Sequence, residues 1–223
     1  MGEIRARTAD EVQERKKAIL AACEELCSRL EYDEITLKEI AQHTALSRTS
    51  MYSYYQRKEE VFLDLLKEKC REWAAAMEEA FLCRGKLTQE DFCVIYSEIL
   101  CRSELTLKLL SLNITAIEKN CSLDAVLSFR QAEEKIFTVL LGVFRKIFPA
   151  VSEEALSGLL TQITAYIYGL YPVTHLSPKL LEVWEHLGQP APDPAMHAVC
   201  LQGITLLIDG FSQRYSEASL SRE

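Results

Sequence analysis

The stretch TLKEIAQHTALSRTSMYSYYQRK, residues 36–58, contains the starts of two helices. Thr36 with a glutamate three positions later forms a capping box, and Ser47 is a second N-cap residue. The two short helices that they predict are joined by a turn at residues 44–46. A small apolar core fits between these helices and consists of Ile40, Ala41, Leu46, Met51 and Tyr55. The stretch therefore predicts a helix-turn-helix.

Polar side chains gather near the N-terminus of the second predicted helix, at Arg48, Thr49, Ser50, Tyr52 and Ser53. Side chains of these types supply the donors and acceptors that read base edges in the major groove. The helix N-termini at Thr36 and Ser47 have free N–H groups that can bind phosphate, and Lys58 can neutralise another phosphate. A plain helical hairpin with solvated polar residues is the alternative, and at this point it stays open.

Outside this stretch, the composition favours helices. The chain has 223 residues and 25.4 kDa, with 48% apolar and 26% charged residues, so it can bury a sizeable core. Gly is scarce at 8, and all six Pro lie between Pro149 and Pro194. A β-sandwich or barrel needs more turn residues than this. We predict an all-α chain, with a three-helix helix-turn-helix domain over residues 1–57 and a larger helical domain over residues 58–223.

Residues 155–178 carry no charge, a run that is long enough to span a membrane. The run also contains Ser, Thr, Gln, His and two prolines, so a helix buried on several sides of a globular protein explains it better. We expect this helix to end before Pro172, since proline lacks the N–H group that continues a helix. The sequence therefore predicts no association with a membrane.

Charge is unevenly distributed in this chain, whose net charge at pH 7 is −8. Residues 1–58 carry ten Lys and Arg and ten Asp and Glu, so all the excess negative charge lies in residues 59–223. A neutral N-terminal part is compatible with a phosphate-binding surface. The eight cysteines include no Cys-x-x-Cys pair, and the N-terminus has no apolar leader. Both features favour reduced thiols in a cytoplasmic protein.

The sequence lacks common enzyme motifs. It has no Gly-x-Ser-x-Gly, no Gly-x-Gly-x-x-Gly and no phosphate-binding loop. His175, His186 and His197 are spaced by 11, but prolines intervene and no His-Glu-x-x-His accompanies them. We therefore expect no enzymatic activity, no metal site and no cofactor.

Residues 40–59 resemble a known DNA-binding signature. The matching residues are Ile40-Ala41, Leu46-Ser47-Arg48, Ser50-Met51-Tyr52, Tyr54-Tyr55 and Lys58-Glu59. They are similar to the signature of the TetR (tetracycline-repressor-like) family, and the resemblance covers about the first 70 residues. It implies a transcriptional regulator, most often a repressor, whose contacts with double-stranded DNA are made by Thr36, Arg48, Ser50, Tyr52, Tyr54 and Lys58.

Two residues depart from the family signature. Ala45 stands in the turn where the family usually has Gly, and a left-handed alanine there costs about 1 kcal/mol. Thr49 replaces the usual Gly of the recognition helix, where a side chain can add a base contact or shift the docking. We therefore do not expect the operators of other family members to apply to this chain.

The family resemblance also implies a homodimer, formed by the last two long helices, that binds an inverted repeat. Gly158 and Gly169 lie about three helical turns apart, and Gly203 and Gly210 about two. Each pair places small residues on one face of a charge-poor helix, which allows close helix approach. We predict that these four glycines lie in the dimer interface; packing within one chain is the alternative.

For the middle helices, the family implies a pocket for a small-molecule effector. The candidate lining residues are Tyr96, Phe129, Phe137, Tyr166, Tyr168, Tyr171, His175 and Trp184. A pocket of this kind suits a hydrophobic or aromatic effector, although each residue also fits ordinary core or dimer packing. A second interpretation from a different class is a helical adaptor that keeps the fold and binds a protein partner instead of DNA.

Overall fold

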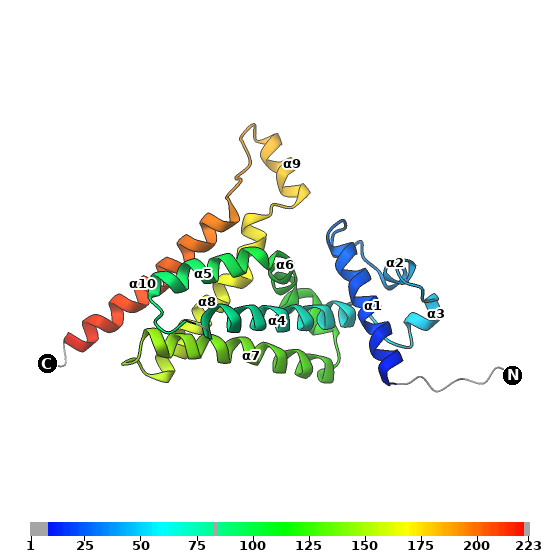
Figure 1. The fold of residues 1–223 in the computed structure, drawn as a ribbon. Helices are drawn as coiled ribbons and strands as arrows, with labels where there is room; N and C mark the ends of the chain where they lie inside the picture. The colour runs from blue at the N-terminus through cyan, green and yellow to red at the C-terminus, as the bar shows by residue number, and fades with distance from the viewer. Residues whose placement is uncertain (1–8, 83, 221–223) are drawn as a thin grey trace. The chain divides into compact units, whose positions relative to one another are not determined.

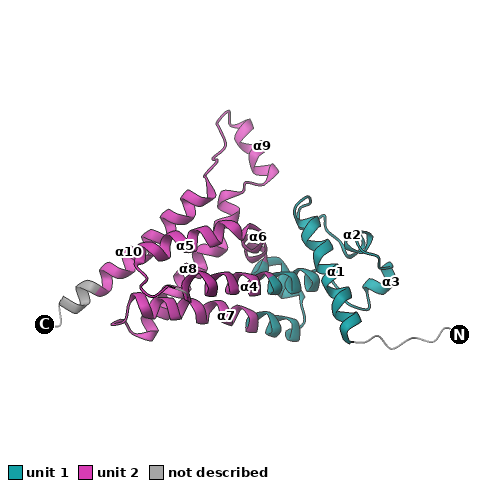
Figure 2. Cartoon of the chain, viewed as in Figure 1, with its two compact units in different colours: residues 1–68, 113–130 teal, residues 69–112, 131–223 magenta. Residues whose placement is uncertain are grey.

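The computed structural model describes residues 9–82 and 84–220, with side chains up to residue 215, and these ranges contain helices and no strand. The all-α prediction is thus confirmed for the described residues. The chain divides into two compact units (Figure 2). Unit 1 consists of residues 1–68 and 113–130, and unit 2 of residues 69–112 and 131–223.

Unit 1 contains the predicted helix-turn-helix. Helix α1 (Ala9–Cys27) packs against α2 (Leu37–Gln42), and α2 packs against α3 (Arg48–Met51) (Figure 1). Both predicted caps are formed, because the Thr36 hydroxyl accepts from the Glu39 N–H and the Ser47 hydroxyl accepts from the Ser50 N–H. The buried residues between the helices include Ile19, Ile40, Ala41, Met51 and Tyr55.

The turn between α2 and α3 is unstrained. No described residue other than glycine has a positive φ, so Ala45 is not left-handed and the expected cost does not arise. Helix α3 is short and ends at Met51. The Ser53 N–H donates to the Ser50 carbonyl at 3.1 Å and the Tyr54 N–H to the Met51 carbonyl at 2.9 Å. These bonds span three residues and tighten the chain into a turn.

Unit 1 extends beyond the predicted range 1–57. It also includes the first part of α4 (Lys58–Leu82), η1 (Asn113–Ile117), η2 (Glu118–Asn120) and the start of α7 (Leu123–Ile147). The Tyr32 hydroxyl joins these segments, at 3.2 Å from a Glu59 carboxylate oxygen and 3.5 Å from the Ala116 carbonyl oxygen. The boundary between the two units therefore lies inside α4. The predicted domain division after residue 57 stays a prediction.

Unit 2 combines the later parts of α4 and α7 with α5 (Gln89–Arg102), α6 (Glu104–Leu112), α8 (Glu153–Thr174), α9 (Pro178–His186) and α10 (Met196–Leu220). Helix α10 packs against α5 and α8, and α6 packs against α8 (Figure 1). Phe92 lies in an aromatic core, with ring centroids 5.6, 5.1 and 5.3 Å from those of Phe81, Tyr96 and Phe144.

Helix α8 does not end where the sequence predicted. It runs past Pro172 to Thr174. Pro172 lies in the last turn, so it removes a single backbone hydrogen bond near an end that frays in any case. The Thr174 hydroxyl donates to the Leu170 carbonyl and the His175 N–H to the Tyr171 carbonyl, both at 2.9 Å. Within the described ranges, no helix is long and apolar enough to cross a membrane.

Helix α9 buries none of its residues. Ser177 caps it, and Gly188 follows it with a φ of 64°. Its side chains Leu180, Leu181 and Val183 are each at least 40% exposed. Within unit 2, α9 stands off on the connections that lead to it from α8 and onward to α10 (Figure 1).

Gly203 is in tight contact within unit 2. A Cβ atom at this position would lie 2.3 Å from the Tyr166 ring and hydroxyl, and that hydroxyl donates to the Val199 carbonyl at 2.7 Å. Gly203 therefore lets α10 pack closely on Tyr166 of α8 in the same chain. For Gly203, this packing within one chain is the alternative to the predicted role in the dimer interface.

We expect Gly203→Ala to destabilise the protein by about 1–3 kcal/mol, because the added methyl must displace Tyr166 and break its hydrogen bond. Urea unfolding followed by circular dichroism measures this change. Gly142→Ala in α7 is the matched control, since a Cβ there meets nothing within 4 Å. The control should be neutral or stabilising by up to about 1 kcal/mol. Equal stabilities of the two variants would contradict this account.

Candidate nucleic-acid interface

Arg48, Thr49 and Tyr52 form one exposed face at α3. Residues three and four apart lie on the same side of a helical turn, and all three side chains are exposed. Met51 points to the other side, is fully buried and anchors the segment in unit 1. A guanidinium, a hydroxyl and a phenol thus face solvent together. These groups bond to base edges and phosphates.

The other side chains near α3 that were predicted to contact DNA are less accessible for that role. The Ser47 hydroxyl accepts from the Ser50 N–H and donates to the Ser50 hydroxyl at 3.0 Å. Tyr54 is half-buried. These side chains shape the N-terminal turn of α3, whereas the exposed face lies on its solvent side.

Thr36 and Lys58 are also engaged within unit 1. The Thr36 hydroxyl donates to the Glu39 carboxylate. The Lys58 ammonium donates to the Tyr32 carbonyl at 2.6 Å and lies 4.1 Å from the centroid of the Tyr32 ring. If the Lys58 side chain extends away from Tyr32 to bind a phosphate, it loses this hydrogen bond.

The structure also exposes polar residues that the sequence analysis did not single out, namely Lys38, Gln42, His43 and Arg57. The charges of residues 36–58 already indicate that this segment is basic. The segment contains four cationic residues and one acidic residue, Glu39. The net charge of zero over residues 1–58 hides this local excess. The helix-turn-helix is therefore the basic part of unit 1.

A half-buried ionic cluster connects the chain that follows α3 to the rest of unit 1. Asp64 accepts from the Tyr55 hydroxyl at 2.9 Å and from the Lys67 ammonium at 2.5 Å, and Lys16 of α1 lies 3.5 Å away. Lys67 also reaches the Ser128 hydroxyl of α7 at 3.4 Å. Burial alone would raise the pKa of Asp64, but hydrogen bonds and charge from Lys67, Tyr55 and Lys16 outweigh it and hold the pKa below 3.8.

This cluster predicts a loss of stability in acid. Because the pKa of Asp64 is lowered on folding, its contribution is complete above about pH 4 and declines as the pH falls from 3.8 through the folded value. We expect the difference in unfolding free energy between the wild type and Asp64→Asn to be largest near neutral pH and to shrink below pH 4. Urea unfolding at a series of pH values measures it. A difference that stays constant down to pH 3 would contradict the assignment.

Three of the eight predicted pocket residues, Tyr96, Phe137 and Tyr168, line one cavity in unit 2. The cavity has a volume of about 20 Å³ and is lined also by Trp73 and Glu133. Glu133 is not among the pocket residues predicted from the sequence. The signal was present, because Glu133 is the charged residue within the otherwise apolar stripe of α7 formed by Phe129, Ile136, Leu140 and Phe144.

The structure does not bring the other five predicted pocket residues to this cavity. Phe129 is fully buried in unit 1, and Tyr166 packs on Gly203. Tyr171 stacks on His175, with ring centroids 4.1 Å apart, and Trp184 lies in α9.

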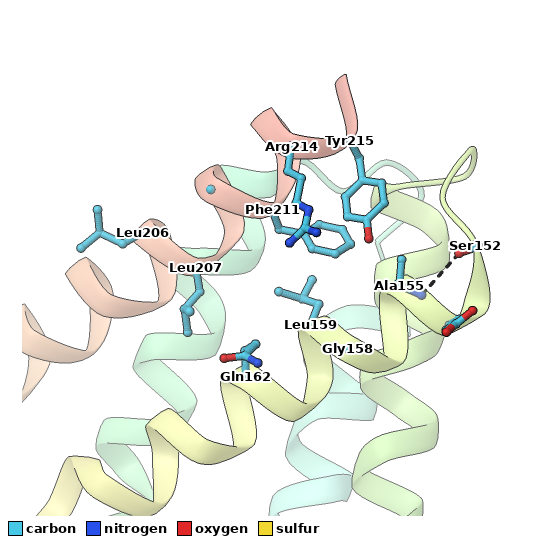
Figure 3. Close-up of a pocket in the computed structure, with 12 residues that line it drawn as sticks. Ser152, Ala155, Gly158, Leu159, Gln162, Leu206, Leu207, Phe211, Arg214 and Tyr215 are labelled. Carbon is cyan, nitrogen blue, oxygen red and sulfur yellow. Dashed lines mark hydrogen bonds between the residues drawn. The ribbon is translucent and has the colours of Figure 1, made fainter. Parts of the chain in front are cut away.

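A groove of about 580 Å³ runs between α8 and α10 (Figure 3). Leu159 of α8 and Phe211 of α10 lie on its two sides, and Arg214 and Tyr215 lie beyond Phe211 (Figure 3). Its lining includes Gly158, Gly210 and other small, polar or apolar residues. The groove is therefore an open space between the two helices predicted to form the dimer.

Three of the four predicted interface glycines have free space around them. Gly158, Gly169 and Gly210 are exposed, and a Cβ atom on any of them would meet nothing within 4 Å. Gly203 differs, because Tyr166 of the same chain covers it. The free glycines leave room for another helix to approach α8 and α10 closely.

Two family models together match most of the chain. Residues 19–65 match the model described as bacterial regulatory proteins of the tetR family, and residues 67–215 match that of the tetracyclin repressor-like C-terminal domain. The protein is a helix-turn-helix transcriptional regulator and not an enzyme. It belongs to the TetR family. No curated protein matches the chain.

Solved structures of transcriptional regulators share the fold. FadR from Bacillus subtilis, in complex with stearoyl-CoA, is 17% identical with a TM-score of 0.55, over 87% of this chain and 98% of that one. FadR from Bacillus halodurans is 11% identical with a TM-score of 0.57, over 92% and 96%. A TetR/AcrR-family regulator from Thermobifida fusca is 15% identical with a TM-score of 0.54, over 88% and 98%.

Proposed function

We propose that the chain is a cytoplasmic, homodimeric repressor that binds an inverted repeat in DNA and is released by a small hydrophobic or aromatic effector. The observation that carries this proposal is the exposed face of Arg48, Thr49 and Tyr52 on the anchored helix α3. We propose these three residues as the main contacts with DNA bases and phosphates. Supporting contacts are proposed for Thr36, Ser47, Ser50, Tyr54 and Lys58.

The α8–α10 groove supports the dimer. TetR-family regulators are typically dimers. Gly158 and Gly210 line the groove, so a second copy of these helices can approach closely there. A two-fold dimer presents two copies of α3, and this matches the symmetry of an inverted repeat.

The cavity of unit 2 supports regulation by a small molecule. The similar FadR structure contains stearoyl-CoA, which favours a small-molecule effector for this chain as well. At about 20 Å³ the cavity holds about one water molecule, so an effector must open it. Such an effector binds the opened conformer better and shifts the population towards it, with a typical coupling to DNA binding of about 1–3 kcal/mol.

The helices that line the cavity also reach into unit 1. Helix α4 contributes Trp73 to the cavity and Asp64 to the half-buried ionic cluster. Helix α7 contributes Glu133 to the cavity and Ser128 to the same cluster. We propose that these two helices connect effector binding to the cluster that holds Tyr55, four residues after α3.

Selection of the purified protein against random duplex DNA at roughly 0.1 M salt tests the proposal. We expect an inverted repeat whose half-sites lie about one helical turn, or a small multiple of it, apart. DNA binding without sequence preference, or no DNA binding, would overturn the proposed repressor function and favour the helical adaptor. Capture of a protein partner that tolerates Arg48→Ala would then support that alternative.

A further inference from the structure

The cavity of unit 2 is lined by aromatic and aliphatic side chains and by one carboxylate. Trp73 comes from α4, Tyr96 from α5, Glu133 and Phe137 from α7 and Tyr168 from α8. The Trp73 and Tyr96 rings are parallel, with centroids 6.2 Å apart. A volume of about 20 Å³ means that these side chains surround a space of one small polar group.

Two of the lining residues have buried donors without an acceptor. Trp73 is 5% exposed and Tyr96 is fully buried, and neither Trp73 Nε1 nor the Tyr96 hydroxyl has a hydrogen-bond partner among the described residues. Buried polar groups are nearly always bonded to protein or to a bound molecule. Because an indole N–H can only donate, the missing group must contain an acceptor.

Glu133 places a carboxylate at the same cavity. It is 5% exposed, and its Oε1 accepts from the Tyr168 hydroxyl at 3.2 Å. A carboxylate has about four acceptor sites, so it can take a donor from a bound molecule in addition. Burial, and then the charge of Glu133, raise the pKa of the adjacent Cys70 thiol to about 12. An anion in the cavity would meet the same repulsion.

We propose that the cavity binds a neutral aromatic or apolar molecule through a hydroxyl group that bridges Glu133 to the indole N–H of Trp73. A hydroxyl oxygen accepts from the indole N–H while its hydrogen is donated to the carboxylate. An ammonium group cannot accept from Trp73, and a carboxylate adds a second negative charge. This inference rests on the proposed effector function and names the chemical class of the effector as phenols and related hydroxyl compounds.

Phe137 and Tyr168 mark the side from which the cavity can open. Both are half-buried, whereas Trp73, Tyr96 and Glu133 are buried. The hydroxyl is thus held at the inner end of the cavity. The body of the ligand displaces Phe137 and Tyr168 and packs between the remaining aromatic rings.

Calorimetric titration of the full chain with three matched probes tests the proposal. The probes are 4-ethylphenol, its methyl ether 4-ethylanisole, and the anion 4-ethylbenzoate. We expect 4-ethylphenol to bind roughly tenfold or more tightly than 4-ethylanisole, since the ether cannot donate to Glu133. The anion should bind most weakly. Equal affinities for the phenol and the ether, or binding of none of the three, would overturn the proposal.

Two variants locate the site. The chain has two tryptophans, so Trp184→Phe leaves the emission of Trp73 as the tryptophan signal, and we expect 4-ethylphenol to change that emission with unaltered affinity. Glu133→Gln should weaken 4-ethylphenol binding and reduce the discrimination against 4-ethylbenzoate. An unchanged Trp73 signal, or unchanged discrimination in Glu133→Gln, would contradict the assignment. If the protein selects an inverted repeat but does not bind phenols, this inference is refuted and the proposed DNA-binding function is not.

Discussion

Replacing Arg48 by alanine is expected to weaken binding to the selected operator by roughly 30-fold to more than 10,000-fold. An arginine that contacts a base edge contributes about 1–3 kcal/mol, and a dimer on an inverted repeat loses this contact twice. Arg48 is exposed on α3, above the buried Met51, so its removal leaves the core of unit 1 intact. Fluorescence anisotropy with a labelled operator measures the affinity at fixed salt.

Arg29→Ala is the matched control for this change. Arg29 is an exposed cation of unit 1 that pairs with Glu25 and precedes the helix-turn-helix segment in the sequence. Its loss alters the net charge by the same amount, so we expect a small effect, within about threefold, on operator affinity. An operator affinity of Arg48→Ala equal to that of Arg29→Ala would refute direct reading of the operator by α3.

Replacing Gly158 by glutamate is expected to convert the dimer to a monomer and to lower operator affinity by at least roughly 100-fold. A side chain at Gly158 meets nothing within 4 Å in its own chain, so the fold of unit 2 accommodates it. In the proposed interface the same side chain blocks close helix approach and buries an unpaired charge in each subunit. Monomers then bind one half-site at a time and lose the gain from simultaneous binding.

Light scattering after size exclusion tests this prediction, since the mass should fall from about twice 25.4 kDa to 25.4 kDa. Gly142→Glu in α7 is the control, because it is the same change at a glycine that also has free space but lies outside the groove. The control should remain a dimer and retain operator affinity. A dimeric Gly158→Glu would exclude the α8–α10 groove as the interface.

The fold was predictable wherever local signals agree with packing. In α4, the residues Phe62, Leu66, Cys70, Trp73, Met77 and Phe81 follow one another at intervals of three or four, and all are buried. The caps at Thr36, Thr88 and Ser177 mark helix starts because a side-chain oxygen must satisfy N–H groups that have no partner in the helix.

The candidate sites were predictable only in part, because they depend on contacts between distant residues. The sequence indicates that Arg48 and Lys58 are both basic. Only the fold shows that Arg48 faces solvent while Lys58 bonds to the Tyr32 carbonyl, 26 residues away. In the same way, the apolar stripe of α7 marks Glu133 as a buried charge, but only the fold shows that Trp73 and Tyr96 line the same cavity.

The shortness of α3 limits what each subunit can read in its operator. Four helical residues rise by about 6 Å, which corresponds to about two base-pair steps of B-DNA at 3.4 Å each. Even with Tyr52 beyond its end, α3 covers few pairs in the major groove. The rest of the selectivity must therefore come from the spacing between half-sites and from how easily the DNA between them bends or narrows. We expect the central, uncontacted pairs of the operator to matter as much as some contacted ones.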